Sequence, residues 1–447
     1  MRNNPFHELV SKCFEQTKNS HDPVASYLSS FSLVLWKMLS ERTGDKEFEQ
    51  ARTKAVTEEM AAELIHKGMD NFEKKYPDEV KYLFSMVLNH ISFYNEDGRM
   101  LIRLMDHLSS VSVQDIFKKG SAEDYVGELH DAGFNKNISS GFSVSVYMLR
   151  LMRAALSIQE KDRIFAFGCA PVTSILDCFI NEKSTDVSAQ DMNVLFAIMA
   201  KIHLALFNID HSRIVPQNFY EQPAFVRKDR LETFDCVFGV SHMGAIPSEQ
   251  AEKLRNDRYN RFPEHLVDRF SKELVTLAHA LKVLRPRVGR GAILLPQKFL
   301  SMMNTRKIRT YMVSMNYVDT VASLPSYLFP GRSTALSLLI FRMSKQDKKV
   351  LFIDAEPFCS KADRSIDQKK FLETYFNRTE SENSMLVDNT EILGRDASLF
   401  APVYQKSKPA MKRKSTQHLK EKLSDIDGRL NEVRDELDES LNRLGRS

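Results

Sequence analysis

Two short segments hold residues whose types and spacing could bind a nucleoside. The first, RIFAFGCAPVTSILDCF (163–179), is an apolar strand that runs into Gly168 and Cys169. The second contains Asp191, which follows Cys169 by 22 positions, the spacing expected of an acid that binds ribose hydroxyls. In a competing interpretation, which we adopt, Asp191 caps the next helix and Asn193 lies in its first turn.

A third segment, FDCVFGVSHMGAI (234–246), is a strand followed by a loop in which His242 could act as a general base. The sequence shows no carboxylate that would orient this histidine and no nucleophile that it would deprotonate. We therefore interpret His242 as an ordinary loop histidine. The five cysteines are scattered without a CxxC pair, which predicts buried thiols in a reducing cytoplasm and no metal site.

The framework that must position these segments alternates short apolar strands with helices between residues 126 and 360. The strand candidates are RIFAFGCA, FDCVFGV, GAILLP, VDTVASL, ALSLLIF and KKVLFIDA. This alternation predicts an α/β fold with a doubly wound, mainly parallel sheet. Residues 1–125 are predicted to be helical, with Asp22 as an N-cap and Pro23 as the first residue of a helix.

The tail, residues 361–447, is predicted to be helical and to end in a heptad helix over 415–444. Its apolar seam is formed by Leu419, Leu423, Ile426, Leu430, Val433, Leu437, Leu441 and Leu444. An isolated helix would expose this seam, so we expect a partner, either the N-terminal helices of the same chain or a second protein. The basic residues between Lys406 and Lys414 are interpreted as a solvated linker, with contact to DNA phosphates as the alternative.

Residues 289–342 also carry a family resemblance. The pattern GRGAILLP, IR, LPSYLF and STALSLLIF, in this order, resembles the modification (methyltransferase) subunits of type I restriction enzymes, which are N6-adenine DNA methylases. The resemblance extends over about 120–405. It implies a Rossmann-like methyltransferase domain at 126–360, a helical domain at 1–125 and a tail that packs on a specificity subunit.

The motifs that do chemistry in that family are altered here. Its D-P-A-C-G-S-G-G turn keeps Cys169, but the aspartate is replaced by Ala166 and three glycines by Ala170, Val172 and Thr173. Bulky side chains in this turn would fill the space of the cofactor, S-adenosylmethionine. The segment that closes over the cofactor keeps only Phe142. If the cofactor binds, the resemblance assigns its contacts to Gly168, Cys169, Asp191 and Phe142.

The family's catalytic N-P-P-F/Y loop falls on Val240, Ser241, His242 and Met243. Valine offers no acceptor for an adenine amine, and methionine is a poor stacking surface. We therefore expect no bound cofactor and no confident catalytic residue. The prediction is a catalytically degenerate DNA methyltransferase-like subunit that serves as a scaffold or DNA-binding component of a restriction-modification or defence assembly. The alternative is an active S-adenosylmethionine-dependent adenine-N6 methyltransferase with aberrant motifs.

The expected partners are DNA and, through the heptad helix, a specificity-subunit-like protein or a second copy of the chain. A net charge of +4 neither requires nor excludes nucleic acid, because a basic surface can lie on a nearly neutral protein. No apolar run is long enough to cross a bilayer, and MRNNPFHELV has no signal-peptide pattern. We therefore expect a cytoplasmic protein without a membrane segment.

Overall fold

The computed structural model describes residues 4–15, 17, 20, 22–133, 144–169, 174–182, 186–330 and 334–404. Residues 1–404 form one compact unit and residues 405–447 a second. The predicted heptad helix at 415–444 and the basic run before it lie outside the described residues. So do Phe142 and the turn residues Ala170, Val172 and Thr173.

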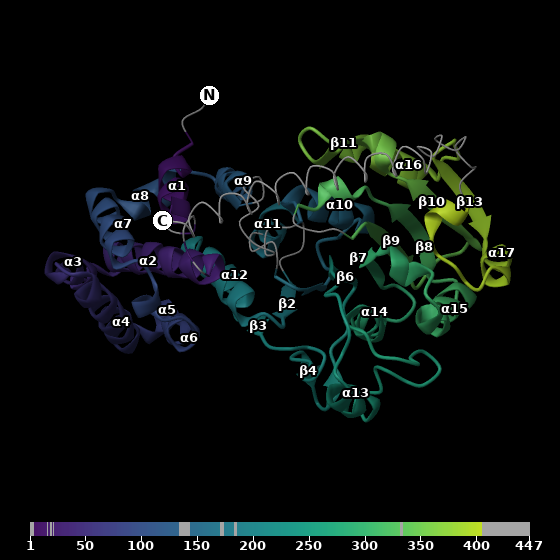
Figure 1. The fold of residues 1–447 in the computed structure, drawn as a ribbon, viewed down its shortest axis with the longest axis horizontal. Coiled ribbons are helices and arrows are strands. Elements are labelled where there is room, and N and C mark those ends of the chain that lie inside the picture. The colour runs from purple at the N-terminus through teal and green to yellow at the C-terminus, as the bar shows by residue number, and fades with distance from the viewer. Residues whose placement is uncertain are drawn as a thin grey trace, which may run out of the picture. The chain divides into compact units, whose positions relative to one another are not determined.

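Helices make up the N-terminal part of the chain, as the sequence predicts (Figure 1). Asp22 caps the second helix by accepting hydrogen bonds from the N–H groups of Val24 and Ala25, and Pro23 is its first residue. The helix ends at Thr43, and the next residue, Gly44, caps it with a left-handed φ of 70°. The helices in order are α1 His7–Glu15, α2 Pro23–Thr43, α3 Glu47–Lys54, α4 Glu58–Lys75, α5 Pro77–Val80, α6 Leu83–His90, α7 Gly98–Ser110, α8 Val113–Lys119 and α9 Ala122–Gly133.

Strands and helices then alternate through the rest of the described chain. The strands of the main sheet are β1 Ile164–Phe167, β2 Val187–Asp191, β3 Ile214–Pro216, β6 Cys236–Val240, β7 Arg290–Pro296, β8 Val318–Ser323, β9 Leu336–Arg342, β10 Lys349–Asp354 and β13 Ser384–Asp388. Two small hairpins are formed by β4 Val226–Arg227 with β5 Arg230–Leu231 and by β11 Cys359–Ser360 with β12 Ser365–Ile366. The helices are α10 Val146–Leu156, α11 Ser174–Asn181, α12 Val194–Leu206, α13 Ser248–Arg255, α14 Lys272–Val283, α15 Arg306–Ser314, α16 Gln368–Asn377 and α17 Asn389–Gly394.

The nine strands of this sheet, within the described residues, follow the order β13-β10-β8-β9-β7-β6-β1-β2-β3. Strand β1 pairs in parallel with β2 on one side and β6 on the other. Strand β9 runs antiparallel to both of its neighbours, and β13 runs antiparallel to β10. The sheet is therefore mainly parallel, and the predicted doubly wound α/β fold is confirmed.

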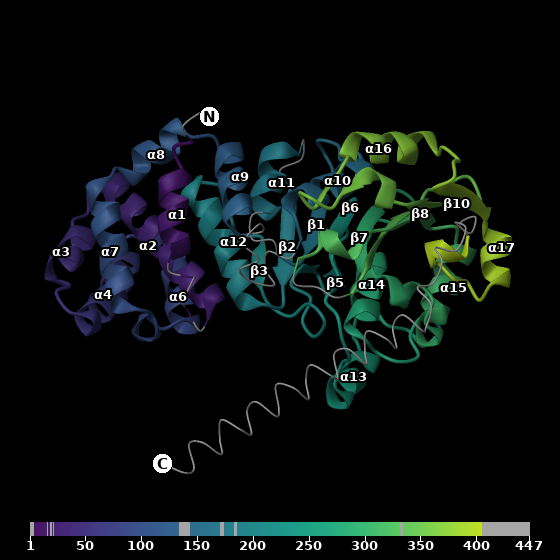
Figure 2. The same ribbon diagram turned by 45° about the horizontal axis from the view of Figure 1, so that its top comes forward.

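Both faces of the sheet are buried, because successive side chains of its strands enter two different hydrophobic cores. In β7, Leu294 belongs to the core that includes the N-terminal helices, whereas Ile293 belongs to the opposite core. Figure 2 shows α10, α11 and α16 on one side of the sheet and α14 and α15 on the other. The division into three domains at residues 125 and 360 stays a prediction. The expectation that the chain is helical from residue 361 onward is wrong for residues 361–404, because β13 extends the main sheet by pairing with β10. No helix among the described residues has the length and hydrophobicity that crossing a membrane requires.

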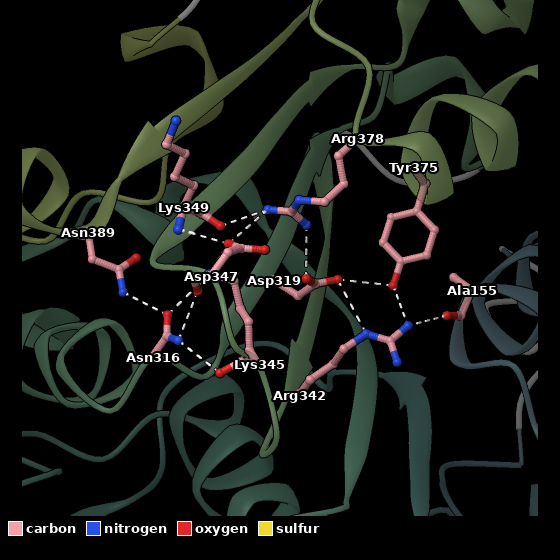
Figure 3. Close-up of polar contacts among 10 residues, drawn as sticks. All are labelled: Ala155, Asn316, Asp319, Arg342, Lys345, Asp347, Lys349, Tyr375, Arg378 and Asn389. Atoms are coloured by element: carbon pink, nitrogen blue, oxygen red, sulfur yellow. Dashed lines mark hydrogen bonds and ion pairs between the residues drawn. The ribbon is translucent and has the colours of Figure 1, made fainter.

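A cluster of charged side chains joins α10 and α16 to the sheet (Figure 3). The register of β8 shifts between Val318 and Thr320, which places Asp319 at an irregularity of the strand. Its carboxylate accepts hydrogen bonds from Tyr375 Oη at 3.0 Å and from Arg378 Nη1 at 3.0 Å. Arg342 lies 3.4 Å from the same carboxylate and donates to the carbonyl of Ala155 at 2.9 Å. We call these residues the Asp319 cluster.

Candidate functional site

The carboxyl ends of β1, β2 and β6 meet where the strand order reverses. From β1 the chain proceeds outward through β2 and β3, and it then returns to place β6 on the other side of β1. In open α/β sheets, ligands bind at such a switch point, outside the carboxyl ends of the strands. Gly168 and Cys169 follow β1, Asp191 ends β2, and Val240–Met243 end β6 and follow it.

Gly168 turns the chain at the end of β1. Its φ of +92° lies in a region that other residues rarely adopt, and among the described residues an added Cβ would meet only the Asp191 carboxylate, at 3.8 Å. The turn directs the Cys169 N–H at Asp191 Oδ2, with an N···O distance of 2.6 Å. The backbone angle therefore favours glycine here.

Asp191 is 1% exposed, and backbone donors hold both of its carboxylate oxygens. Besides the bond from Cys169, Oδ1 accepts a hydrogen bond from the Asn193 N–H at 2.8 Å. The expectation that Asp191 caps the following helix is wrong. The N-cap of α12 is Asn193, whose Oδ1 accepts from the Leu195 N–H at 3.1 Å. The reason is that β2 extends through Asp191, so the helix begins only at Val194.

Cys169 contributes its backbone to this site and not its thiol. Burial raises the pKa of the thiol well above its usual range, and the nearby Asp191 charge adds to the effect. A protonated, buried thiol is neither a nucleophile nor a metal ligand. All cysteines are free, and no group of three or more His, Cys, Asp or Glu side chains among the described residues could hold a metal ion.

His242 meets a carboxylate that the local sequence did not reveal. Its Nε2 lies 3.7 Å from Asp191 Oδ1, although the two residues are far apart in the chain. The rings of Phe219 and Tyr220 lie 6.4 Å and 6.2 Å from the imidazole, centroid to centroid. The other ring nitrogen, Nδ1, is buried and has no hydrogen-bond partner in the part of the chain that the structure describes.

The loop after β6 presents few polar groups. Val240 and Met243 are partly buried against the core, and Ser241 uses its hydroxyl to donate to the carbonyl of His242 at 2.8 Å. A recess of about 430 Å³ opens beside Met243 on the side of α14 and β7. Its lining includes Phe270, Pro296, Phe299, Arg269, Lys298 and Asn304.

Residues 217–225, which we call the strap, are held by the side chains of Gln190 and Arg261, a role that the sequence did not indicate. Gln190 donates to the carbonyl of Gln222 at 2.7 Å and accepts from the Ala224 N–H at 3.0 Å. Arg261, 1% exposed, donates to the carbonyls of Phe219 at 2.6 Å and Tyr220 at 2.7 Å. An isolated arginine in a loop gives no sequence signal for such a role.

Known proteins share this fold and part of the sequence. The model of the N-6 DNA methylase family matches residues 173–413, which is more than half of the chain. A curated relative, the type I restriction enzyme MpnII methylase subunit of Mycoplasma pneumoniae, is 23% identical over 279 residues. That match covers 56% of this chain and 50% of the relative, so it spans about half of the relative's length.

Two solved structures extend the comparison of folds. The type I restriction-modification methyltransferase subunit from Streptococcus thermophilus has a TM-score of 0.63 at 16% identity, covering 89% of this chain and 98% of that one. A chain from a study of complex assembly and conformational transition in the type I R-M system has a TM-score of 0.65 at 17% identity, covering 99% of both chains. The resemblance to type I modification subunits is thereby confirmed, and the chain belongs to the N-6 DNA methylase family.

Proposed function

We propose that this protein is a modification-subunit-like member of its family that does not transfer methyl groups. It acts as a scaffold and DNA-binding component of a restriction-modification or defence assembly in the cytoplasm. This proposal rests on the side chains of the loop after β6. A transferase that acts on adenine needs side chains in this loop that hold the base.

The side chains of that loop are chemically unsuited to the transfer. Val240 has no hydrogen-bond acceptor for an exocyclic amine, and the hydroxyl of Ser241 is already bound to the carbonyl of His242. Met243 packs partly into the core. Group transfer is catalysed when the reacting atoms are held close together in the right orientation. A loop that cannot bind the base does not provide this positioning.

The cofactor end of the sheet supports the same proposal. Ala166 is buried within β1, where the family has an aspartate, and it cannot accept a hydrogen bond through its side chain. Ala170, Val172 and Thr173 replace the three turn glycines in the sequence. Each replacement restricts the φ and ψ angles that the backbone can adopt and adds a side chain where a glycine would leave room for a ligand.

The proposal also includes association with a partner protein and with DNA. The relatives named above include subunits of type I restriction enzymes, which are assemblies. We place the contact with a specificity-subunit-like partner, or with a second copy, at the heptad seam over 415–444, and contact with DNA in the resulting complex. The basic run from Lys406 to Lys414 is a second candidate for contact with phosphates.

Titration calorimetry with S-adenosylmethionine and a tritium-transfer assay on duplex DNA test the loss of activity. We expect neither heat of binding nor tritium in DNA, with or without partner proteins. Replacing Val240→Asn and Met243→Phe together should not restore transfer, because the cofactor turn is also altered. Micromolar binding of the cofactor, or incorporation above a no-protein control, contradicts the proposal.

One observation favours the alternative, an active adenine-N6 methyltransferase with aberrant motifs. Asn304 lines the 430 Å³ recess beside Met243, and its Oδ1 is buried without a hydrogen-bond partner among the described residues. This oxygen could accept a hydrogen bond from an amine in place of the missing loop acceptor. If tritium does enter DNA, Asn304→Ala should abolish the transfer, whereas the exposed neighbour Met303→Ala should not.

A further inference from the structure

The loop between β9 and β10 carries a buried lysine with few partners among the described residues. The side chain of Lys345 is 2% exposed. In the part of the chain that the structure describes, its Nζ has one hydrogen bond, to Asn316 Oδ1 at 3.3 Å, and one ion pair, with Asp347 Oδ1 at 3.6 Å (Figure 3). An ammonium group has three donors, so a charged Lys345 would leave hydrogen-bonding capacity unused in a buried position. Burial accordingly lowers the pKa of Lys345, which favours the neutral amine.

Hydrogen bonds fix the orientation of the side-chain amide of Asn316 beside this lysine. Its Nδ2 donates to the carbonyl oxygens of Lys345 at 3.0 Å and Asp347 at 2.9 Å. Its Oδ1 accepts a hydrogen bond from Asn389 Nδ2 at 2.9 Å, in addition to the one from Lys345 Nζ. Asn316 follows α15 with a left-handed φ of 57°, a conformation that asparagine tolerates. This backbone angle explains the asparagine but not the lysine that faces it.

These contacts give each group a role in a reaction between the amine and the amide. A neutral lysine amine is a nucleophile, and the Cγ atom of Asn316, which is bonded to Oδ1, is the electrophile. The Nδ2–H of Asn389 donates to Oδ1 and would stabilise the negative charge that develops on this oxygen during the attack. The Asp347 carboxylate, which accepts a hydrogen bond from the Lys349 N–H at 2.9 Å, lies where it can take a proton from Nζ.

We propose that Lys345 and Asn316 become joined by an intramolecular isopeptide bond after the chain has folded. A bond forms between Nζ and Cγ of Asn316, and the bond between Cγ and Nδ2 breaks. The ammonium group of Lys345 gives one proton to Asp347, which passes it to Nδ2, and it gives a second proton to water. Nδ2 leaves as ammonia, and Nζ keeps one hydrogen in the new amide. No atom is oxidised or reduced.

The bond ties the end of α15 to the loop between β9 and β10. It replaces a buried charge by a neutral amide, which removes the cost of holding an ammonium group away from water. It also closes a covalent loop that contains β8 and β9, two strands that pair in the sheet. A closed loop lowers the conformational entropy of the unfolded chain, so the bond stabilises this part of the sheet.

Intact-mass spectrometry of the denatured full-length protein tests the proposal. We expect the wild type to be lighter than its sequence by one molecule of ammonia. Lys345→Met removes the nucleophile while keeping a long apolar chain, and this variant should have the mass of its own sequence. The matched control is Lys348→Met, which removes an exposed lysine of the same loop and should retain the loss of ammonia.

A tryptic digest of the wild type locates the bond. It should contain a branched peptide in which Asn316 is joined to Lys345, and trypsin should not cleave after Lys345, because the side chain is then an uncharged amide. Asp347→Asn removes the group that carries the proton. Most of that variant should therefore be unlinked when it is freshly purified.

The outcomes are distinct. A wild-type mass equal to that of the sequence overturns the proposal, and this result does not depend on whether any variant folds. Loss of ammonia without the branched peptide also overturns it, since an asparagine that cyclises on its own backbone loses the same molecule. If Asp347→Asn is linked as completely as the wild type, the role assigned to Asp347 is refuted.

Discussion

A single buried histidine illustrates how one residue can set the response of the protein to acid. His203 in α12 is fully buried, with Nε2 2.7 Å from Tyr27 Oη and Nδ1 2.9 Å from Tyr125 Oη. A neutral imidazole has one donor and one acceptor, so one tyrosine hydroxyl donates to it and the other accepts. Burial lowers the pKa of His203 to about 3. Protonation would put an unneutralised charge between α2, α9 and α12.

The pH dependence of stability follows from this shift. An unfolded histidine titrates near pH 6.5, so between about pH 6.5 and pH 3 the unfolded chain binds the proton and the folded chain does not. The free energy of unfolding should therefore fall as the pH falls through this window. His203→Gln should reduce the slope by up to about 1.4 kcal/mol per pH unit, measured by urea unfolding between pH 7 and pH 5.

The control for this prediction is His66→Gln, at an exposed position. That variant should keep the wild-type slope. His211, whose pKa burial lowers to about 4, acts in the same direction and remains in both variants. An unchanged slope in His203→Gln would show that His203 binds a proton as readily in the folded protein as in the unfolded chain.

At the scale of elements, the Asp319 carboxylate binds the end of α16 directly and is linked to α10 through Arg342 (Figure 3). The Asp319 side chain is 8% exposed and faces the guanidinium groups of Arg342 and Arg378. Burial and the neighbouring Asp319 charge raise the pKa of Tyr375, which therefore stays protonated and donates its hydroxyl hydrogen. Removing the carboxylate leaves two cations close together without their common counterion.

Asp319→Ala should therefore lower the free energy of unfolding by about 3–5 kcal/mol, as expected when a buried ion pair loses one partner. The matched control is Asp106→Ala, whose carboxylate is 49% exposed and pairs with Arg52 at 2.7 Å. That change should cost at most about 1 kcal/mol, since water screens exposed pairs. Equal losses in urea unfolding at neutral pH would show that the cluster does not anchor the helices.

The sequence predicts some elements better than others, for physical reasons. Apolar runs such as AILLP and ALSLLIF identify strands directly, and β7 and β9 lie there. The strand β2, VSAQD, is fully buried by its neighbours in the sheet although its own residues have little strand propensity, and it was not among the expected strands. The antiparallel direction of β9 depends on chain connections that no local pattern encodes.

The candidate site was predictable only in part. Asp191, Gly168 and Cys169 were identified from motif spacing, and the structure brings them together. The contact of Asp191 with His242 arises from strand order, because β2 and β6 flank β1. Asp191 and His242 lie at the ends of different strands, and a contact between such distant segments leaves no periodic pattern in the sequence.

At the scale of the whole molecule, the chain divides into two units, residues 1–404 and residues 405–447. The sequence of the second unit carries an apolar seam that a solitary helix would expose. We therefore expect the seam to contribute to association with a partner and not to the stability of the first unit.

Replacing Leu430 and Leu437 by aspartate tests this expectation, since charges in the seam oppose its burial. The double variant should lose its partner, or its dimer, in light scattering and co-purification. Its main thermal transition should be unchanged. Asn431→Asp with Asn442→Asp adds two carboxylates outside the seam and should retain the partner. A lowered main transition in the leucine variant would assign the helix to the fold of its own chain.

The central position of β1 in the sheet has a consequence for biosynthesis. Strand β1, Ile164–Phe167, pairs with β2 soon after it is made, but its other neighbour, β6, begins only at Cys236. At a translation rate of roughly 5–20 residues per second, the ribosome needs several seconds to reach β6. During that interval the β1 edge of the nascent sheet is unpaired and apolar, and such an edge can pair with strands of other chains. The emerging polypeptide is therefore most prone to misassociate while residues between β3 and β6 are being added.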